Sequence, residues 1–111
     1  MNPRLAEGVA LFDAGEYWHA HEAWEDAWRA DDAADSDYFK GLIQLAAVCF
    51  HLRKGNRKPV AWLLTRARHH LTVHDDPRWP FDRDALLELI EELAAAVPGE
   101  GLPRLGRCVR R

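Results

Sequence analysis

Apolar residues recur along most of this chain at the three- and four-residue spacing of amphipathic helices. Near the C-terminus one such stripe is purely aliphatic, and three glutamates face away from it. The stripe consists of Leu86, Leu89, Ile90, Leu93 and Val97. No segment shows the two-residue alternation of β-branched side chains that a strand needs. The pattern therefore predicts an all-α protein.

Capping residues, prolines and glycines divide this pattern into five helical segments. Asparagine and aspartate are favoured just before a helix, proline at its first residue and glycine just after its end. The expected helices run from Pro3 to Gly15, from Glu16 to Ala30, from about Ser36 to Gly55, from Pro59 to His74 and from Asp82 to Pro98.

A faint internal repeat relates the first two helices to the next two at an offset of 40 residues. The matched pairs are Leu5 with Leu45, Phe12 with Leu52, Gly15 with Gly55, Ala20 with Val60, Trp24 with Leu64 and Ala27 with Ala67. Because two units are fewer than the three or more that open repeat arrays need, we expect a closed structure. We predict a compact bundle of about five helices, built from two helical hairpins plus a C-terminal helix.

Length and charge narrow the picture further. The 111 residues suit one domain, which we place at residues 1–98, followed by a basic, solvated and mobile tail over residues 99–111. The formal charge of −3 argues against a general nucleic-acid binder. There is no run of ~20 apolar residues that could span a bilayer, and Cys49 and Cys108 lie far apart. We expect a cytoplasmic protein with neither a membrane nor a nucleic-acid partner.

The segment 16–28 combines three tryptophans with two histidines and four acidic residues. On a helix, His21 lies on one stripe with Tyr17, Trp24 and Trp28, and Glu25 lies at its edge. We interpret the tryptophans as core residues between helices. Core packing does not explain His21 and Glu25, which would need hydrogen bonds if buried, since an unpaired buried polar group costs about 1–3 kcal/mol.

The third predicted helix is apolar almost all round, apart from a narrow stripe of Lys40, Gln44 and His51. Two interpretations stay open. The stripe faces water, or it meets His21 and Glu25 across a helix–helix contact and builds a buried polar centre.

Metal binding has little support in the sequence. His21, Glu25 and His51 could supply three ligands, but the second histidine of a zinc H-E-x-x-H motif is absent. His69, His70 and His74 are explained by the helix dipole, which favours histidine near a helix C-terminus. We expect no metal and no cofactor.

Two segments resemble the hallmarks of the bacterial and archaeal domain-of-unknown-function family 309. They are F-D-A-G-E-Y-W over residues 12–18, followed by His21, Glu22, Glu25 and Trp28, and F-K-G-L-I-Q over residues 39–44, followed by His51 and Gly55-Asn56. The resemblance covers residues 5 to about 71, and Asp13 stands where the family has asparagine. It implies a compact helical fold but no established activity. The family's recurring positions fall on His21, Glu22, Glu25, Trp28, Lys40, Gly41, Gln44 and His51.

Three functions follow as hypotheses. The first is a binding or adaptor module for an unknown protein or small molecule, with a His/Glu/Gln polar centre and with Glu22 and Trp28 as binding candidates. The second is a small hydrolase-like enzyme in which His21 and Glu25 form an acid–base pair, aided by Lys40, Gln44 and His51. The third is a homo-oligomeric scaffold that buries Trp18, Trp62 or Trp79 at an interface.

Overall fold

The computed structural model describes residues 2–30, 36–73, 79–97 and 101–110. These residues form five α-helices and one short 3₁₀ helix. The elements are α1 (Pro3–Asp13), α2 (Tyr17–Ala30), α3 (Ser36–Arg53), α4 (Val60–Thr72), α5 (Arg83–Ala95) and η1 (Leu105–Cys108). The only strand-like pairing in the described part of the chain is an isolated antiparallel bridge between Phe81 and Val109. The predicted all-α class and the five helices are confirmed.

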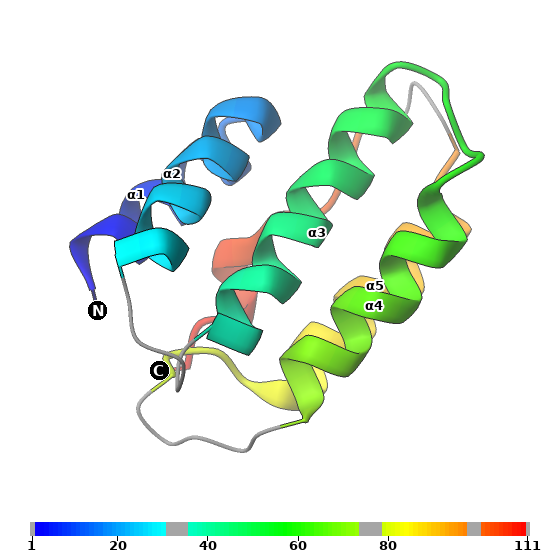
Figure 1. Ribbon diagram of the computed structural model, residues 1–111. Helices are drawn as coiled ribbons and strands as arrows, with labels where there is room; N and C mark the ends of the chain where they lie inside the picture. The colour runs from blue at the N-terminus through cyan, green and yellow to red at the C-terminus, as the bar shows by residue number, and fades with distance from the viewer. Residues whose placement is uncertain (1, 31–35, 74–78, 98–100, 111) are drawn as a thin grey trace.

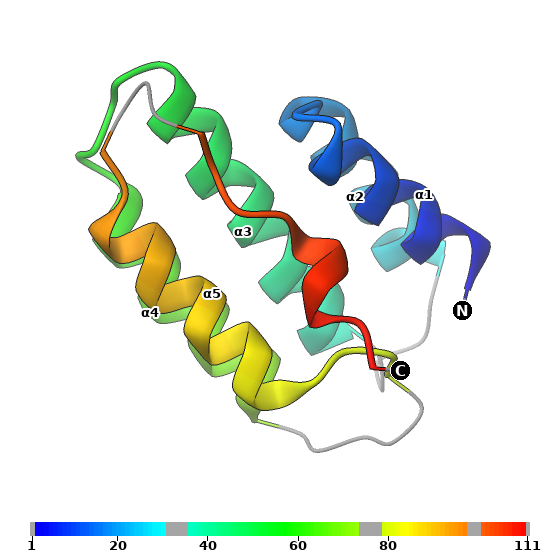
Figure 2. The same ribbon diagram turned by 180° about the vertical axis from the view of Figure 1, so that it is seen from behind.

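The helices form two layers. In the front layer of Figure 1, α2, α3 and α4 lie side by side with α3 in the middle. Helix α1 packs behind α2, and α5 packs behind α4. In Figure 2, which views the molecule from the opposite side, the C-terminal segment runs in front of α3, between α1 and α5. The arrangement confirms two helical hairpins, α1–α2 and α3–α4, closed by a C-terminal helix.

The corners of the two hairpins have the same backbone geometry. Gly15 and Gly55 adopt φ angles of 79° and 78°, a left-handed conformation that favours glycine. At the first corner the N–H groups of Gly15 and Glu16 donate to the carbonyls of Phe12 and Leu11. The N–H groups of Gly55 and Asn56 make the corresponding bonds at the second corner. Both are Schellman motifs, 40 residues apart, as the sequence repeat predicts.

The core also follows the repeat. The five matched apolar pairs are all buried: Leu5 and Leu45, Phe12 and Leu52, Ala20 and Val60, Trp24 and Leu64, and Ala27 and Ala67. Each hairpin therefore buries the same positions, and α2 packs on α3 at the junction between the two hairpins.

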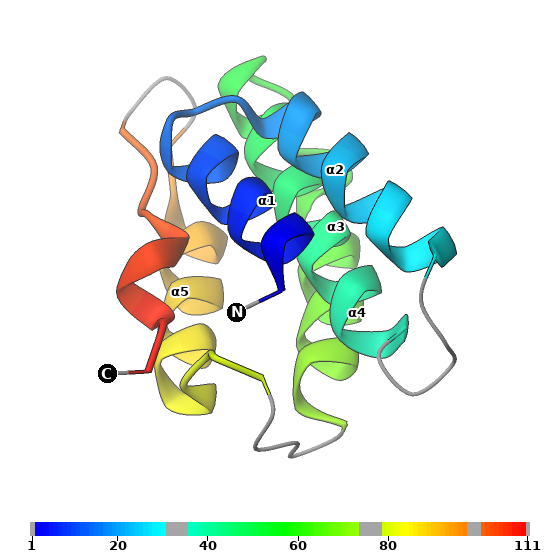
Figure 3. The same ribbon diagram turned by 90° about the vertical axis from the view of Figure 1, so that its left-hand side faces the viewer.

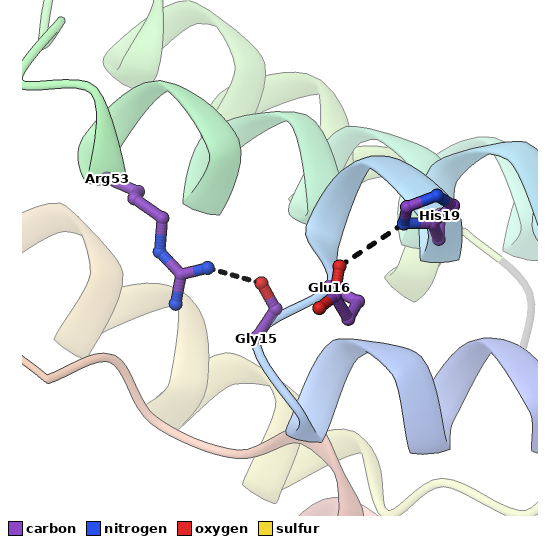
Figure 4. A network of polar contacts seen from close by, with 4 residues as sticks. All are labelled: Gly15, Glu16, His19 and Arg53. Atoms are coloured by element: carbon purple, nitrogen blue, oxygen red, sulfur yellow. Dashed lines mark hydrogen bonds and ion pairs between the residues drawn. The ribbon is translucent and has the colours of Figure 1, made fainter.

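Arg53, at the end of α3, connects the two corners. Its guanidinium donates a hydrogen bond to the Gly15 carbonyl and lies 4.8 Å from the centre of the Tyr17 ring. In Figure 4 the Arg53 side chain reaches from the second hairpin to the corner of the first, next to the contact between Glu16 and His19. A charge-assisted bond to a backbone carbonyl holds the hairpins in one register.

Helix α5 begins as expected and ends early. The Asp82 side chain caps it by accepting from Ala85 N at 3.1 Å. The helix ends at Ala95, and Ala96 is extended. The predicted apolar stripe is therefore wrong at its last residue: Leu86, Leu89, Ile90 and Leu93 are buried, whereas Val97 is 53% exposed.

The C-terminal segment differs most from its prediction. Leu105 and Cys108 are completely buried, and the Asp13 carboxylate accepts hydrogen bonds from the backbone N–H groups of Leu105 (2.7 Å) and Gly106 (3.0 Å). Arg107 pairs with Glu92 of α5 at 2.8 Å. The expectation of a solvated end is wrong for residues 101–110, because apolar residues between the arginines pack against α1 and α5 (Figure 3).

Over the described residues, none of the helices has the length and apolar character required to cross a bilayer.

Candidate functional site

The three tryptophans of α2 have different environments. Trp24 is completely buried, and its indole N–H donates to the Leu5 carbonyl of α1 at 3.3 Å. Its ring occupies the space above Gly8, where a Cβ would lie 2.0 Å from Trp24 Nε1. Trp28 is half-buried and Trp18 is 52% exposed. The prediction that all three build the core is correct for Trp24 and wrong for Trp18.

Two contacts set the register between the antiparallel helices α2 and α3 (Figure 1). The Lys40 ammonium lies 5.5 Å from the centre of the Trp28 ring at one end, and Trp18 and Phe50 lie 5.5 Å apart at the other. The register given by these two contacts places His21 level with Ala47 of α3. One helical turn to either side on α3 are Gln44 and His51.

The polar stripe of α3 lies on the least buried side of this central helix. Lys40, Gln44 and His51 are all half-buried, and so are the residues between them on the same side, among them Ala47. This position differs from both alternatives left open by the sequence. The stripe neither faces water freely nor lies in the core, because α2 covers it only in part.

His21 is held by stacking more than by hydrogen bonding. The Trp18 indole lies parallel to the imidazole, with an angle of 3° between the planes and 5.3 Å between the ring centres. His21 Nε2 is 4.0 Å from Glu25 Oε1, longer than a hydrogen bond. Glu25 is also 3.8 Å from Arg29 Nη2, so its carboxylate lies between two loose partners. The side chains of His21 and Glu25 are 20% and 33% exposed.

Two polar atoms on this part of the molecule are buried without a hydrogen-bond partner among the described residues. They are Nδ1 of His21 and Oε1 of Gln44. Native proteins contain few such atoms, and each costs about 1–3 kcal/mol. We name the surface that contains them the α2–α3 face and define it as Trp18, His21, Glu25, Trp28, Lys40, Gln44 and His51.

Glu22 lies apart from this face. It is exposed and lines an open groove between α1 and α2, together with His19, Asp26 and Arg29. The sequence-predicted candidates therefore occupy two surfaces: Glu22 lies in the α1–α2 groove, and the others line the α2–α3 face.

The remaining predicted positions have structural explanations. Gly41 lies where α3 approaches α4 closely, since a Cβ there would lie 2.5 Å from Leu71 Cγ. His70 Nδ1 contacts Asp37 Oδ1 at 3.1 Å, which joins α4 to the first turn of α3. His74 lies outside the described residues. Within the described ranges, no group of three or more His, Cys, Asp or Glu side chains is placed to hold a metal ion.

Trp18 and Phe50 lie beside the site and were not predicted to do so. Trp18 precedes His21 by three residues, the spacing at which side chains on a helix meet, so its position was readable as a neighbour of that histidine. Phe50 carried no such local signal, because its contact with Trp18 depends on the packing of α2 on α3.

No curated protein and no solved structure matches the chain. One family profile, the domain of unknown function DUF309, matches residues 5–63, which is more than half of the chain and includes every residue of the α2–α3 face. The motifs of residues 12–28 and 39–51 fall inside this match, and the chain belongs to the DUF309 family.

Proposed function

We propose that this protein is a binding module and that the α2–α3 face is its ligand surface. The observation that carries the proposal is the pair of unpartnered buried atoms, His21 Nδ1 and Gln44 Oε1, on two neighbouring helices. Buried polar groups that remain unpaired in the free protein reduce its stability. Such destabilising groups are found preferentially at functional sites, where a ligand or partner pairs with them.

The chemistry of these atoms favours a ligand with an uncharged polar group. Gln44 Oε1 accepts a hydrogen bond, and Nδ1 of a neutral imidazole donates or accepts one according to its tautomer. A primary amide or an alcohol can satisfy both. Trp18 stacks on His21 and is half exposed, so its indole offers an aromatic surface next to this histidine. An aromatic body on the ligand gains stacking on that exposed ring.

An acid–base role for His21 and Glu25 draws less support from the geometry. In such catalytic sites the base is oriented by a hydrogen bond to a further group, and hydrogen bonds of this kind are about 2.7–3.2 Å long. The separation of 4.0 Å between Nε2 and Oε1 leaves His21 without that orientation. Hydrolysis therefore remains the second candidate.

The stability of a Gln44→Met variant tests the proposal. The methionine has a similar shape and removes the unpaired acceptor, so we expect the free energy of unfolding to rise by about 1 kcal/mol. Chemical denaturation followed by circular dichroism measures it. As a control, Glu88→Met on the exposed side of α5 should change stability by less than about 0.5 kcal/mol. A marked loss of stability in Gln44→Met would show that Gln44 serves a structural network instead.

A ligand titration supplies the direct test. Benzamide and benzyl alcohol are added to ¹⁵N-labelled protein while the histidine ring signals are recorded by NMR. We expect the His21 ring signals and the Trp18 indole signal to move. The matched control is His19 on the same helix, which is exposed and contacts Glu16, and its signals should stay in place. Equal shifts of His19 and His21, or none, would argue against a site at the α2–α3 face.

A further inference from the structure

The charges of this protein are strongly segregated along the chain. Between Asp37 and Asp75 there is no acidic residue, and there are seven lysines and arginines. They are Lys40, Arg53, Lys54, Arg57, Lys58, Arg66 and Arg68. The formal charge of the whole chain is −3 and that of this segment is +7, so the residues outside the segment carry a formal charge of −10. The α3–α4 hairpin is thus a basic unit within an acidic molecule.

Some of these cations have structural roles. Arg53 donates to the Gly15 carbonyl, and Arg57 donates to the carbonyls of Ala94 and Ala96 at the end of α5. Cations at such a helix end interact favourably with the dipole. These hydrogen bonds within the chain account for Arg53 and Arg57, so neither arginine indicates a binding partner.

The cations on α4 and in the turn just before it have no such explanation. Lys58, Arg66 and Arg68 are exposed, and no carboxylate in the described part of the chain pairs with them. Trp62 lies among them, 59% exposed, with the Arg66 guanidinium 4.3 Å from the centre of its ring. Residues 62 and 66 are one helical turn apart on α4 and lie on the same side of the helix, and Lys58 lies in the turn just before α4. We name the surface of Lys58, Trp62, Thr65, Arg66 and His69 the α4 outer face.

We propose that the α4 outer face docks an acidic segment of a partner protein. Carboxylates of the segment pair with Lys58 and Arg66, and an apolar side chain covers the Trp62 ring. Tryptophan and arginine are the residue types most enriched among those that dominate binding energy at protein interfaces. Attraction between opposite charges also steers the encounter of the two proteins.

A compact acidic segment suits this surface better than a nucleic acid. Helix α4 has 13 residues and is therefore about 20 Å long. Its neighbour α5 exposes Asp84, Glu88 and Glu91. A long polyanion would extend beyond α4 and meet the negative charge of the rest of the molecule, whereas a short helix with a few carboxylates would not.

This inference goes beyond the proposed ligand site and does not depend on it. The α2–α3 face lies along one side of α3, and α4 packs on the other (Figure 1). A domain with both surfaces can hold a ligand on one and a partner protein on the other.

Binding of a synthetic peptide tests the proposal. The probe is a helical peptide in which a leucine stripe is flanked by glutamates, titrated by fluorescence anisotropy at about 0.15 M salt, where only close charge pairs persist. We expect it to bind the wild type, with affinity at least tenfold weaker in Trp62→Ala and in Arg66→Glu. The matched controls are Trp18→Ala, which removes the other exposed tryptophan, and Arg4→Glu on α1. Both should change the affinity less than twofold.

Four results would overturn the proposal. The first two are that the acidic peptide does not bind, and that a peptide with glutamines in place of the glutamates binds equally well. The other two are that Trp18→Ala and Trp62→Ala weaken binding equally, and that a twelve-residue oligodeoxythymidine binds more tightly than the acidic peptide. Circular dichroism of each variant establishes that it is folded. None of these results changes what is expected of the benzamide and benzyl alcohol titration at the α2–α3 face. Either proposal can therefore fail while the other holds.

Discussion

Cys49 lies in the middle of α3 and is completely buried, and this burial raises the pKa of its thiol to about 12. In the unfolded chain the thiol has its ordinary pKa of 9.0. Above pH 9 the unfolded state therefore loses a proton that the folded state keeps. The contribution of the buried, protonated Cys49 thiol to the free energy of unfolding is complete below pH 9 and declines as the pH rises toward 12.

We predict that ionisation of the Cys49 thiol in the unfolded state lowers the free energy of unfolding by about 1.4 kcal/mol as the pH rises from 8 to 10. A Cys49→Ala variant loses this part of the pH dependence, so its stability should fall less steeply over the same range. Denaturant titrations of both proteins at several pH values measure the difference. Other groups that ionise in this range affect both proteins and cancel. Parallel curves would contradict a buried, protonated Cys49.

For single residues of the site, the sequence predicted the side of the helix on which each one lies, because the helical period determines it. The period placed His21 and Glu25 at one edge of α2 and Lys40, Gln44 and His51 on one side of α3. It could not distinguish buried Trp24 from exposed Trp18, because burial depends on what covers the side chain. Trp24 is buried because Gly8, on another helix, leaves room for its ring.

At the scale of elements, the parts defined by local signals were predicted correctly. Both hairpin corners required a left-handed residue, and the glycines supplied it. The caps at Asn2 and Asp82 were readable from the residue types that accept from free N–H groups. The segment 101–110 was not predictable in this way. Its structure depends on Asp13, which is 92 residues from Leu105 in sequence, and no local propensity carries that information.

We predict that Asp13→Ala loosens this C-terminal segment. The variant loses the acceptor for Leu105 N and Gly106 N at the start of η1, which should cost about 1 kcal/mol. Amide hydrogen exchange at both residues should then become several-fold faster, as NMR can measure. Asp13→Asn keeps an acceptor oxygen and should retain most of the protection. Unchanged exchange in Asp13→Ala would show that Leu105 and Cys108 hold the segment by burial alone.

At the scale of the whole molecule, charge segregation was visible in the sequence but its placement was not. The absence of acidic residues between positions 37 and 75 can be read directly. Which of the cations remain free depends on the fold, since Arg53 and Arg57 bond to carbonyls of other elements. The net charge of −3 averages over two opposite regions and conceals both.

We predict that this segregation is measurable by fluorescence quenching. Iodide is drawn to positive surfaces and caesium to negative ones, and only exposed indoles are quenched efficiently. Trp62 lies among Lys58, Arg66 and Arg68, so Trp62→Phe should remove a larger share of iodide quenching than of caesium quenching. Trp18→Phe serves as the comparison, because Trp18 is similarly exposed but lies on α2, where residues 16–30 carry more acidic than basic side chains. Equal effects of both variants would contradict a basic α4 outer face.

The bond between Asp13 and the N–H groups of η1 also bears on how the chain folds during synthesis. Ribosomes add about 5–20 residues per second, so the 92 residues that separate Asp13 from Leu105 take about 5–18 s to make. Helical hairpins form within microseconds to milliseconds. After the first hairpin has formed, one side of α1 therefore stays uncovered for seconds. We expect chaperones to bind nascent chains that are stalled at this stage, and not to bind chains in which η1 has docked.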